Sequence, residues 1–269
     1  MSRTNTVALS NDQLRAVAPS IFAAQPWEKM SERYTFIPTI NVIEQMRNEG
    51  FIPVNAVQSR TRIEGKGAFT KHQIRFRDIR NGEAPVLTHL GQLFAEIILT
   101  NSHDGASAYK IDAGLMRLVC MNGMTVSQGE HNALSVRHSG SADGIIEASY
   151  EVVEQFPKVL QSAEDFSRLR LTAGQQEAFA EAAIALRYDD GAPITPQQVV
   201  RPRRTADVEP TLWNTFNVAQ EHLTKGGITG RNPQTLQRRK ISPVTGIGEN
   251  TRLNKALWTL TEAMAKLVA

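Results

Sequence analysis

The 269-residue sequence predicts an α+β fold: an antiparallel β-hairpin and meander packed on helices, with a helical C-terminal part. Two observations carry this prediction. Apolar residues recur with helical spacing near both ends of the chain, and with a period of two between about residues 51 and 127. A doubly wound parallel sheet would instead alternate single strands with single helices.

Two helices are expected before the first strand. Ser10 opens a Ser-x-x-Gln capping box, and Leu14 and Val17 follow it at helical spacing. A second short helix is expected to begin near Thr39. It should end at Gly50, which can adopt the left-handed conformation that closes many helices.

A β-hairpin is expected next. Side-chain character alternates over residues 57–62 and 72–77, and Gly65-Lys66-Gly67 suits the connection between them. In the second of these strands, Arg75 and Arg77 alternate with apolar residues. One face of the hairpin is therefore expected to be apolar, and the other to be lined by arginines.

The later elements follow from the same rules. Asn122-Gly123 is a strong hairpin signal, Pro157 should kink or break a helix, and Thr195-Pro196 suits a helix start. The segment Gly226–Arg231 is expected to be mobile. Strands are predicted at residues 94–100, 108–111, 115–120 and 124–127, and helices at residues 145–168, 173–188, 211–224 and 251–268.

Two domains are expected. Residues 1–190 would form the α+β core, which contains the basic hairpin (51–80) and two acidic helices (145–188). Residues 191–269 would form a basic helical C-terminal region.

The net charge of +3 conceals a strong segregation of charge. Residues 56–80 carry seven Lys+Arg against two Asp+Glu, and residues 201–255 carry ten against four. Residues 143–190 carry ten acids and four bases. This pattern favours a positive surface that faces a polyanion, with the acidic part turned away or facing a neighbouring subunit. Two ordinary solvated faces would give the same pattern.

Composition and motifs exclude several classes of protein. The single cysteine, Cys120, cannot form an internal disulfide or a cysteine-based metal site. The longest apolar runs fall far short of the roughly 20 residues that span a bilayer, and no secretory signal is present, so we expect a cytoplasmic protein. No phosphate-binding glycine loop, Gly-x-Ser-x-Gly elbow or His-Glu-x-x-His helix occurs, so we expect neither enzymatic activity nor a cofactor.

The most concentrated polar segment is Asn101-Ser102-His103-Asp104-Gly105. His103 and Asp104 are suitable ligands for a divalent cation such as Mg²⁺, but no second cluster completes a site. The segment also suits a turn, in which Asx-type hydrogen bonds satisfy the backbone and Gly105 takes a positive φ. The sequence favours the turn and keeps the cation site as the alternative.

The basic stretches predict binding to the phosphate backbone of nucleic acid, with aromatic side chains available to stack on unpaired bases. Phe69 and Trp213 are the stacking candidates, although the helical spacing around Trp213 is more typical of a core residue. We expect DNA contacts from Arg60, Arg62, Lys71, Arg75, Arg77, Arg203, Arg204, Lys225, Arg231, Arg238, Arg239 and Lys240.

Several segments together resemble a phage/plasmid-like protein family of unknown function, found widely on conjugative plasmids and prophages. The most specific are Asn101–Gly105 and the Cys-x-Asn-Gly-Met string of residues 120–124. The resemblance spans most of the chain and implies a setting in mobile bacterial DNA, without implying an activity. The other segments that carry it are Tyr34–Thr39, Gln58–Arg62, Phe69–His72, Leu99–Thr100, Arg117–Val119 and Thr211–Asn217.

The element order and basic charge are also similar to those of the single-strand annealing superfamily that includes RecT and Red-beta. This second resemblance is architectural, and no short motif carries it. It implies an ATP-independent protein that binds single-stranded DNA and pairs complementary strands. It also implies a homo-oligomer, either a ring or a helical filament, with an exonuclease as a further partner.

Two other functions are compatible with the sequence. A metal-dependent nuclease or phosphohydrolase centred on His103 and Asp104 would need Mg²⁺ or Mn²⁺ and would lose activity in His103→Ala. A host-directed anti-defence protein would instead bind a bacterial protein through its acidic helices.

Overall fold

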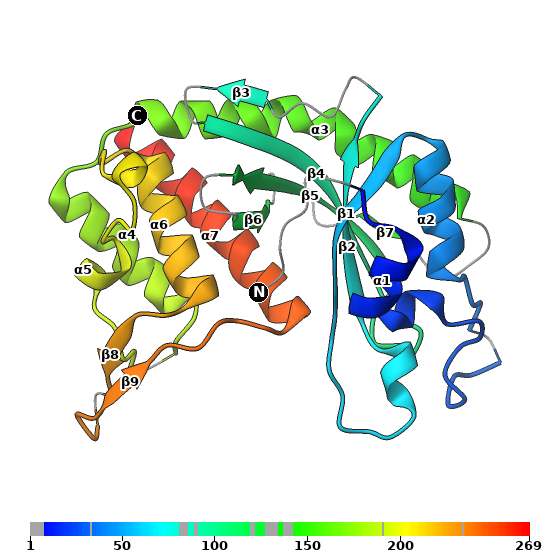
Figure 1. Cartoon of the computed structure of the whole chain (residues 1–269). Coiled ribbons are helices and arrows are strands. Elements are labelled where there is room, and N and C mark those ends of the chain that lie inside the picture. The colour runs from blue at the N-terminus through cyan, green and yellow to red at the C-terminus, as the bar shows by residue number, and fades with distance from the viewer. Residues whose placement is uncertain are drawn as a thin grey trace. The chain divides into compact units, whose positions relative to one another are not determined.

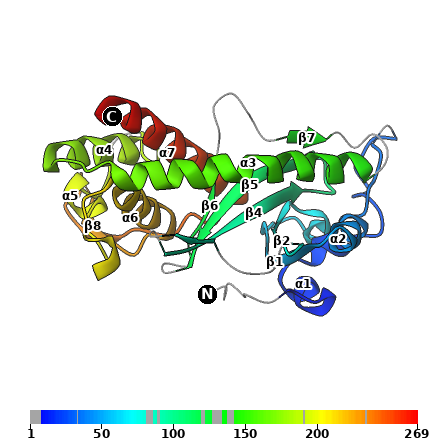
Figure 2. The ribbon, with the colours of Figure 1, turned by 90° about the horizontal axis from the view of Figure 1, so that it is seen from above.

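The computed structural model confirms the α+β class and divides into two compact units, Met1–Pro157 and Lys158–Ala269. The division falls inside the continuous helix α3 (Asp143–Arg168), at its internal proline (Figure 2). The expected domain boundary at residue 190 therefore lies within the second unit. The structure describes residues 8–32, 34–80, 86–88, 91–118, 122–126, 134–136, 142–189, 191–232 and 234–269.

The described strands of the first unit form a seven-stranded sheet in which every pairing is antiparallel (Figure 1). Its main path runs β1-β2-β4-β5-β6, while β3 pairs with β4 and β7 pairs with β5. The strands are β1 (Phe51–Gln58), β2 (His72–Asp78), β3 (Val86–Thr88), β4 (Gly91–Asn101), β5 (Tyr109–Arg117), β6 (Asn122–Thr125) and β7 (Leu134–Val136).

The predicted hairpin is present as the antiparallel pair β1 and β2, but its first strand lies earlier than expected. Residues 59–71 form the connection, which includes the 3-10 helix η2 (Lys66–Phe69). The two short strands predicted between residues 108 and 120 are one strand, β5. Asn122 and Gly123 lie inside β6, opposite Arg117 and Met116, so they are not the turn that the sequence indicated.

Helices α1 (Asn11–Val17) and α2 (Thr39–Asn48) form where the sequence predicts them, and the 3-10 helix η1 (Pro19–Phe22) follows α1. The capping box at Ser10 is complete, and Gly50 has a φ of +83° after α2. Helix α2 packs on β1, and the Tyr150 ring of α3 lies 5.5 Å from the Phe51 ring of β1. These contacts attach the helices of the first unit to the edge of its sheet.

The second unit is mainly helical, and α6 is its buried centre. Every residue of α6 from Leu212 to Thr224 is buried, and α6 packs against α4, α5 and α7. The rings of Phe216 and Trp258 lie 5.7 Å apart in this core. The elements are α4 (Ala173–Ala185), α5 (Pro196–Val199), the 3-10 helix η4 (Thr205–Asp207), α6 (Leu212–Lys225), β8 (Thr229–Arg231), β9 (Arg238–Lys240) and α7 (Ile247–Val268).

Among the helices that the structure describes, none combines the length and the apolar character needed to cross a lipid bilayer.

Candidate nucleic-acid interface

Strands β8 and β9 form a two-stranded antiparallel ribbon that extends from the helices of the second unit (Figure 1). The ribbon is rich in exposed cations, and none of them forms an ion pair with a carboxylate in the described part of the chain. We call this surface the basic ribbon. Its cations are Arg231, Arg238, Arg239 and Lys240.

One side of the basic ribbon is fixed to the loop that precedes α5 and to α5 itself. The Arg231 backbone N–H donates to the Pro193 carbonyl at 2.8 Å, and the Gln198 side chain donates to the Thr229 carbonyl at 3.1 Å. Gly230 approaches the loop so closely that an added Cβ would lie 1.6 Å from the Pro193 oxygen. Only glycine fits here, because the contact is between two backbones.

At its base, just after the end of α6, the two strands of the basic ribbon are bonded to each other and to Arg187, which follows α4. The Gly227 N–H donates to the Ile241 carbonyl at 2.9 Å, and the Ile241 N–H donates to the Ile228 carbonyl at 2.8 Å. The guanidinium of Arg187 donates to the Ser242 carbonyl at 2.7 Å. The base of the ribbon is therefore held on both strands, which gives its cations a defined position.

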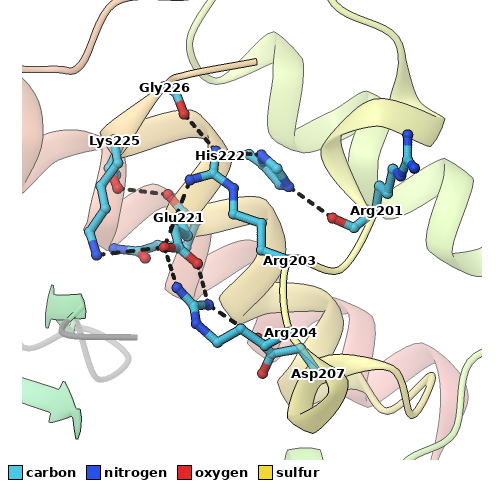
Figure 3. Close-up of polar contacts among 10 residues, drawn as sticks. Arg201, Arg203, Arg204, Asp207, Glu221, His222, Lys225 and Gly226 are labelled. Atoms are coloured by element: carbon cyan, nitrogen blue, oxygen red, sulfur yellow. Dashed lines mark hydrogen bonds and ion pairs between the residues drawn. The ribbon is translucent and has the colours of Figure 1, made fainter. Parts of the chain in front are cut away.

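Beside the base of the ribbon, three cations gather around the buried carboxylate of Glu221 (Figure 3). Arg204 donates two hydrogen bonds to Glu221, at 2.6 and 2.7 Å, and lies 3.3 Å from Asp207. Arg203 Nη1 and Lys225 Nζ lie 3.8 and 3.7 Å from Glu221 Oε1. We call these five side chains the arginine node. Three cations share two carboxylates, so the arginine node has one net positive charge.

The charge state of Glu221 follows from its surroundings. Burial alone would raise the pKa of Glu221, but the hydrogen bonds from Arg204 and the charges of Lys225, Arg204 and Arg203 lower this pKa overall. The carboxylate stays ionised and orients the guanidinium of Arg204, which is charged at all relevant pH values.

Arg203 joins the arginine node to the segment that leads into β8 (Figure 3). Its Nη2 donates to His222 Nδ1 at 2.8 Å and to the Gly226 carbonyl at 2.6 Å. Because a guanidinium can only donate, His222 Nδ1 is the acceptor, and His222 Nε2 donates to the Arg201 carbonyl at 2.9 Å. Burial lowers the pKa of His222, in agreement with this neutral tautomer.

The arginine node and the basic ribbon together can bind phosphate groups. The side chains of Arg203 and Lys225 remain 32% and 39% exposed, and Arg201 is exposed beside them. Along the chain, these cations precede the Gly226-Gly227 connection, and the basic ribbon follows it. Arginine and lysine at such positions hold phosphate oxygens by charge-assisted hydrogen bonds.

The arginine face of the hairpin in the first unit is buried, which corrects the expectation that it faces solvent. Arg75 Nη1 lies 2.9 Å from Glu96 Oε2, and Arg77 Nε and Nη2 lie 3.0 and 2.9 Å from Glu96 Oε1. The Arg77 guanidinium also lies 3.7 Å from the centre of the Phe94 ring. The predicted alternation is correct, but a buried acid on β4 pairs with both arginines, which leaves neither available to a phosphate.

The remaining basic candidates of the first unit lie in the connection between β1 and β2. Arg60 and Arg62 are exposed there, and Lys71 is half-buried. They belong to the first unit, whereas the basic ribbon and the arginine node belong to the second.

The two stacking candidates have different surroundings. Trp213 is 1% exposed, and its ring lies 6.0 Å from the Phe216 ring in the core of the second unit. The prediction that Trp213 stacks on a base is therefore wrong, because the core that surrounds α6 covers the indole. Phe69 lies at the end of η2 and is partly exposed, so its role as a stacking residue stays a prediction.

The polar segment after β4 forms a buried turn. Asn101, Ser102 and His103 are inaccessible to solvent, and Asp104 Oδ2 lies 3.0 Å from Lys66 Nζ. Asp104 Oδ1 accepts from the backbone N–H two residues later at 3.0 Å, and Gly105 has a φ of +77°. The Asx-type turn and the positive φ agree with the turn interpretation.

The hydroxyl of Thr39, the first residue of α2, collects the polar groups of this turn. Asn101 Nδ2 donates to it at 3.0 Å, and His103 Nε2, His72 Nε2 and the Tyr109 hydroxyl lie 3.1, 2.9 and 3.2 Å from it. The network joins α2 to three strands of the sheet. Among the described residues, no group of three His, Cys, Asp or Glu side chains is placed to hold a metal ion, so the metal-enzyme alternative gains no support.

Four features of the second unit were not recognised in the sequence: Gly230, Arg187, the exposed Arg201 and the ribbon itself. Residues 229–231 form β8, which corrects the expectation of a mobile segment. Three-residue strands are too short to show alternation. The turn dipeptide Asn232-Pro233, which directly follows Arg231 and precedes Arg238 by five residues, was the available signal.

The fold and this surface define a two-unit α+β protein that carries an anchored basic β-ribbon. The chain belongs to the family described as domain of unknown function DUF932, whose family model matches residues 26–258. This membership agrees with the resemblance to a family of unknown function.

Two curated relatives come from Escherichia coli (strain K12). The chain is 39% identical to UPF0380 protein YafZ and 38% identical to UPF0380 protein YfjQ, each over 258 residues. Each alignment covers 95% of this chain and 91% of the relative. No solved structure matches.

Proposed function

We propose that this protein binds single-stranded DNA along the basic ribbon and the adjoining arginine node. The observation that carries the proposal is the exposure of four ribbon cations that have no carboxylate partner among the described residues. An arginine paired with a carboxylate is already partly neutralised, so it gains less from a phosphate contact. An unpaired exposed arginine gains the contact together with the release of counterions.

The anchoring of the ribbon supports this role. Backbone contacts at Gly230 and at Gly227 hold the two strands, so the cations need little further ordering when a strand binds. Preorganisation of this kind lowers the entropic cost of binding.

We further propose that the protein pairs complementary strands without ATP, as a homo-oligomer in the bacterial cytoplasm. Binding through the phosphates leaves base edges exposed to a complementary strand. The exposed acids of α3 and α4, such as Glu151, Glu154 and Glu181, would face basic surfaces of the next copy. The resemblance of the element order and basic charge to RecT and Red-beta, drawn from the sequence alone, suggests this part of the proposal.

The double variant Arg238→Ala/Arg239→Ala tests the binding site. Its affinity for unrelated single-stranded oligonucleotides should fall by a similar factor for each, because phosphate contacts carry no sequence information. The slope of log Kobs against log salt should shrink by about 1.4, or about 0.7 for each lost phosphate contact. Fluorescence anisotropy over a salt series measures both quantities.

The matched control is Arg168→Ala/Arg170→Ala, which removes the same charge from exposed arginines of the same unit. Arg168 and Arg170 lie 3.8 and 3.3 Å from the carboxylates of Glu164 and Glu209, so their loss should change affinity much less. Equal losses of DNA affinity in the two double variants would show that the ribbon arginines act only through the net charge of the protein, and would contradict the proposed binding site.

Annealing is tested with complementary labelled oligonucleotides in EDTA. Faster pairing in the presence of the protein, lost in Arg238→Ala/Arg239→Ala, is the expected result. Metal-dependent cleavage of DNA that His103→Ala abolishes would instead favour the nuclease alternative.

A further inference from the structure

Leu236, close to the tip of the basic ribbon, is a large apolar side chain in an unusual position. It is 68% exposed and has a φ of +58°, which makes it the one described non-glycine residue with a positive φ. A leucine in the left-handed region is strained, because its Cβ lies too close to the following carbonyl oxygen. Such conformations persist only where the surrounding structure holds them, and they cluster at functional positions.

The turn itself holds Leu236 in this conformation. The side-chain oxygen of Asn232 accepts hydrogen bonds from the N–H groups of Gln234 and Thr235, both at 2.9 Å. The Leu236 N–H then donates to the Asn232 carbonyl at 2.8 Å, and the Asn232 N–H donates to the Gln237 carbonyl at 2.9 Å. These bonds close the turn and leave the isobutyl group in solvent.

The surroundings of Leu236 indicate which ligand it would contact. Residues 234–240 are all exposed, and Arg231 and Arg238 form the last paired rung before the turn. A single leucine beside cations is a poor match for an apolar protein groove. A nucleic-acid strand offers the matching alternation, because flat apolar base faces are spaced between phosphates.

We propose that Leu236 inserts between adjacent bases of the bound strand while Arg231 and Arg238 hold the flanking phosphates. The inference rests on the proposed function and adds to it, since phosphate binding alone would leave the bases stacked. Inserted apolar side chains partly unstack neighbouring bases in other nucleic-acid complexes. Here the insertion would open the strand for pairing.

The test uses single-stranded oligonucleotides that contain 2-aminopurine, whose fluorescence rises when neighbouring bases unstack. The intact protein should raise this fluorescence on binding. Leu236→Ala should lose most of the rise and lower the affinity by about tenfold or less, because one apolar contact is removed. Its salt slope should equal that of the intact protein, since no cation is lost.

Two further variants keep the result interpretable. Leu236→Asn preserves the turn, because asparagine tolerates the left-handed conformation, and it should lose the fluorescence rise as Leu236→Ala does. Leu236→Met keeps an apolar side chain and should restore most of the rise. Val208→Ala is the matched control, since Val208 is 63% exposed in the same unit and should leave the signal unchanged.

The outcomes separate this inference from the proposed function. Full fluorescence rise in Leu236→Ala, with binding retained, overturns insertion and leaves DNA binding in place. Light scattering without DNA measures the oligomeric mass of Leu236→Ala. A mass different from that of the intact protein would assign Leu236 to a protein–protein contact and overturn the inference. Absence of DNA binding by the intact protein overturns both.

Discussion

Glu96 is inaccessible to solvent in the first unit and pairs with Arg75 and Arg77. Both arginines are nearly buried, so the single negative charge of Glu96 is shared between two guanidinium groups in a medium of low polarity. Neighbouring glycines make room for them, because an added Cβ at Gly123 would lie 2.8 Å from the Arg75 guanidinium carbon. Removing one partner of a buried ion pair destabilises the fold by more than the pair itself stabilises it, because the remaining charge stays buried without a partner.

Glu96→Gln should therefore lower the free energy of unfolding by about 3–5 kcal/mol. Urea denaturation followed by circular dichroism measures the loss. Glu44→Gln is the control, because Glu44 is 49% exposed in its pair with Arg47 and such pairs contribute about 0–1 kcal/mol. Similar losses in both variants would contradict the assignment of Glu96 as the acid that stabilises the buried group.

Single residues of the polar turn were recognised in the sequence, although their environment was not. The Asx-type turn at Asp104 and the positive φ of Gly105 are local properties, so the sequence indicated them. The contacts of His103 with the hydroxyl of Thr39 join residues 64 positions apart, and no local pattern encodes them. The sequence therefore indicated a turn, but not its burial.

Among the elements, the basic ribbon depends most on one glycine. Gly230→Ala would place a methyl group 1.6 Å from the Pro193 oxygen, so β8 must move away from the loop. We expect the Arg231 amide to lose its protection against hydrogen exchange, because its bond to Pro193 breaks. DNA affinity should fall as the ribbon becomes disordered.

The control for this change is Gly174→Ala in α4, where an added Cβ meets nothing within 4 Å. Alanine is the better helix former, so this variant should be as stable as the original or slightly more so. Unaltered exchange of the ribbon amides in Gly230→Ala would show that Pro193 does not hold the ribbon.

Helix starts were the elements most fully predicted. The capping box predicted at Ser10 is complete, and Thr195 caps α5 at the predicted start, because caps depend on residues three positions apart. Thr172 completes a further capping box, which was not predicted. The ribbon was missed because its strands have three residues each, and the contacts that fix them come from α5, Arg187 and the loop at Pro193.

At the scale of the whole molecule, each unit buries a histidine that stays neutral. Burial lowers the pKa of His72 in the first unit to about 4, and burial also lowers the pKa of His222 in the second. In the unfolded chain both would titrate near the ordinary value of about 6.5. Below that pH the unfolded state binds more protons, so the free energy of unfolding falls as pH falls.

We therefore expect acid to destabilise both units below about pH 6.5. For His72 the loss continues down to about pH 4, at up to about 1.4 kcal/mol per pH unit and about 3 kcal/mol in total. Urea denaturation over a pH series measures it. His72→Gln should be less stable at neutral pH and should show a shallower pH dependence; an unchanged slope would assign the acid sensitivity to other groups.

The sequence by itself determined the α+β class, most helix positions and the two cationic segments, because capping, periodicity and charge depend on neighbouring residues. Only the tertiary structure decided which cations face solvent. Arg75 and Arg77 are buried because Glu96 lies beside them on an adjacent strand, whereas Arg238 and Arg239 are exposed on a ribbon that Pro193 and Arg187 hold in place. A side chain's partners across the fold set its burial, and no local pattern specifies those partners.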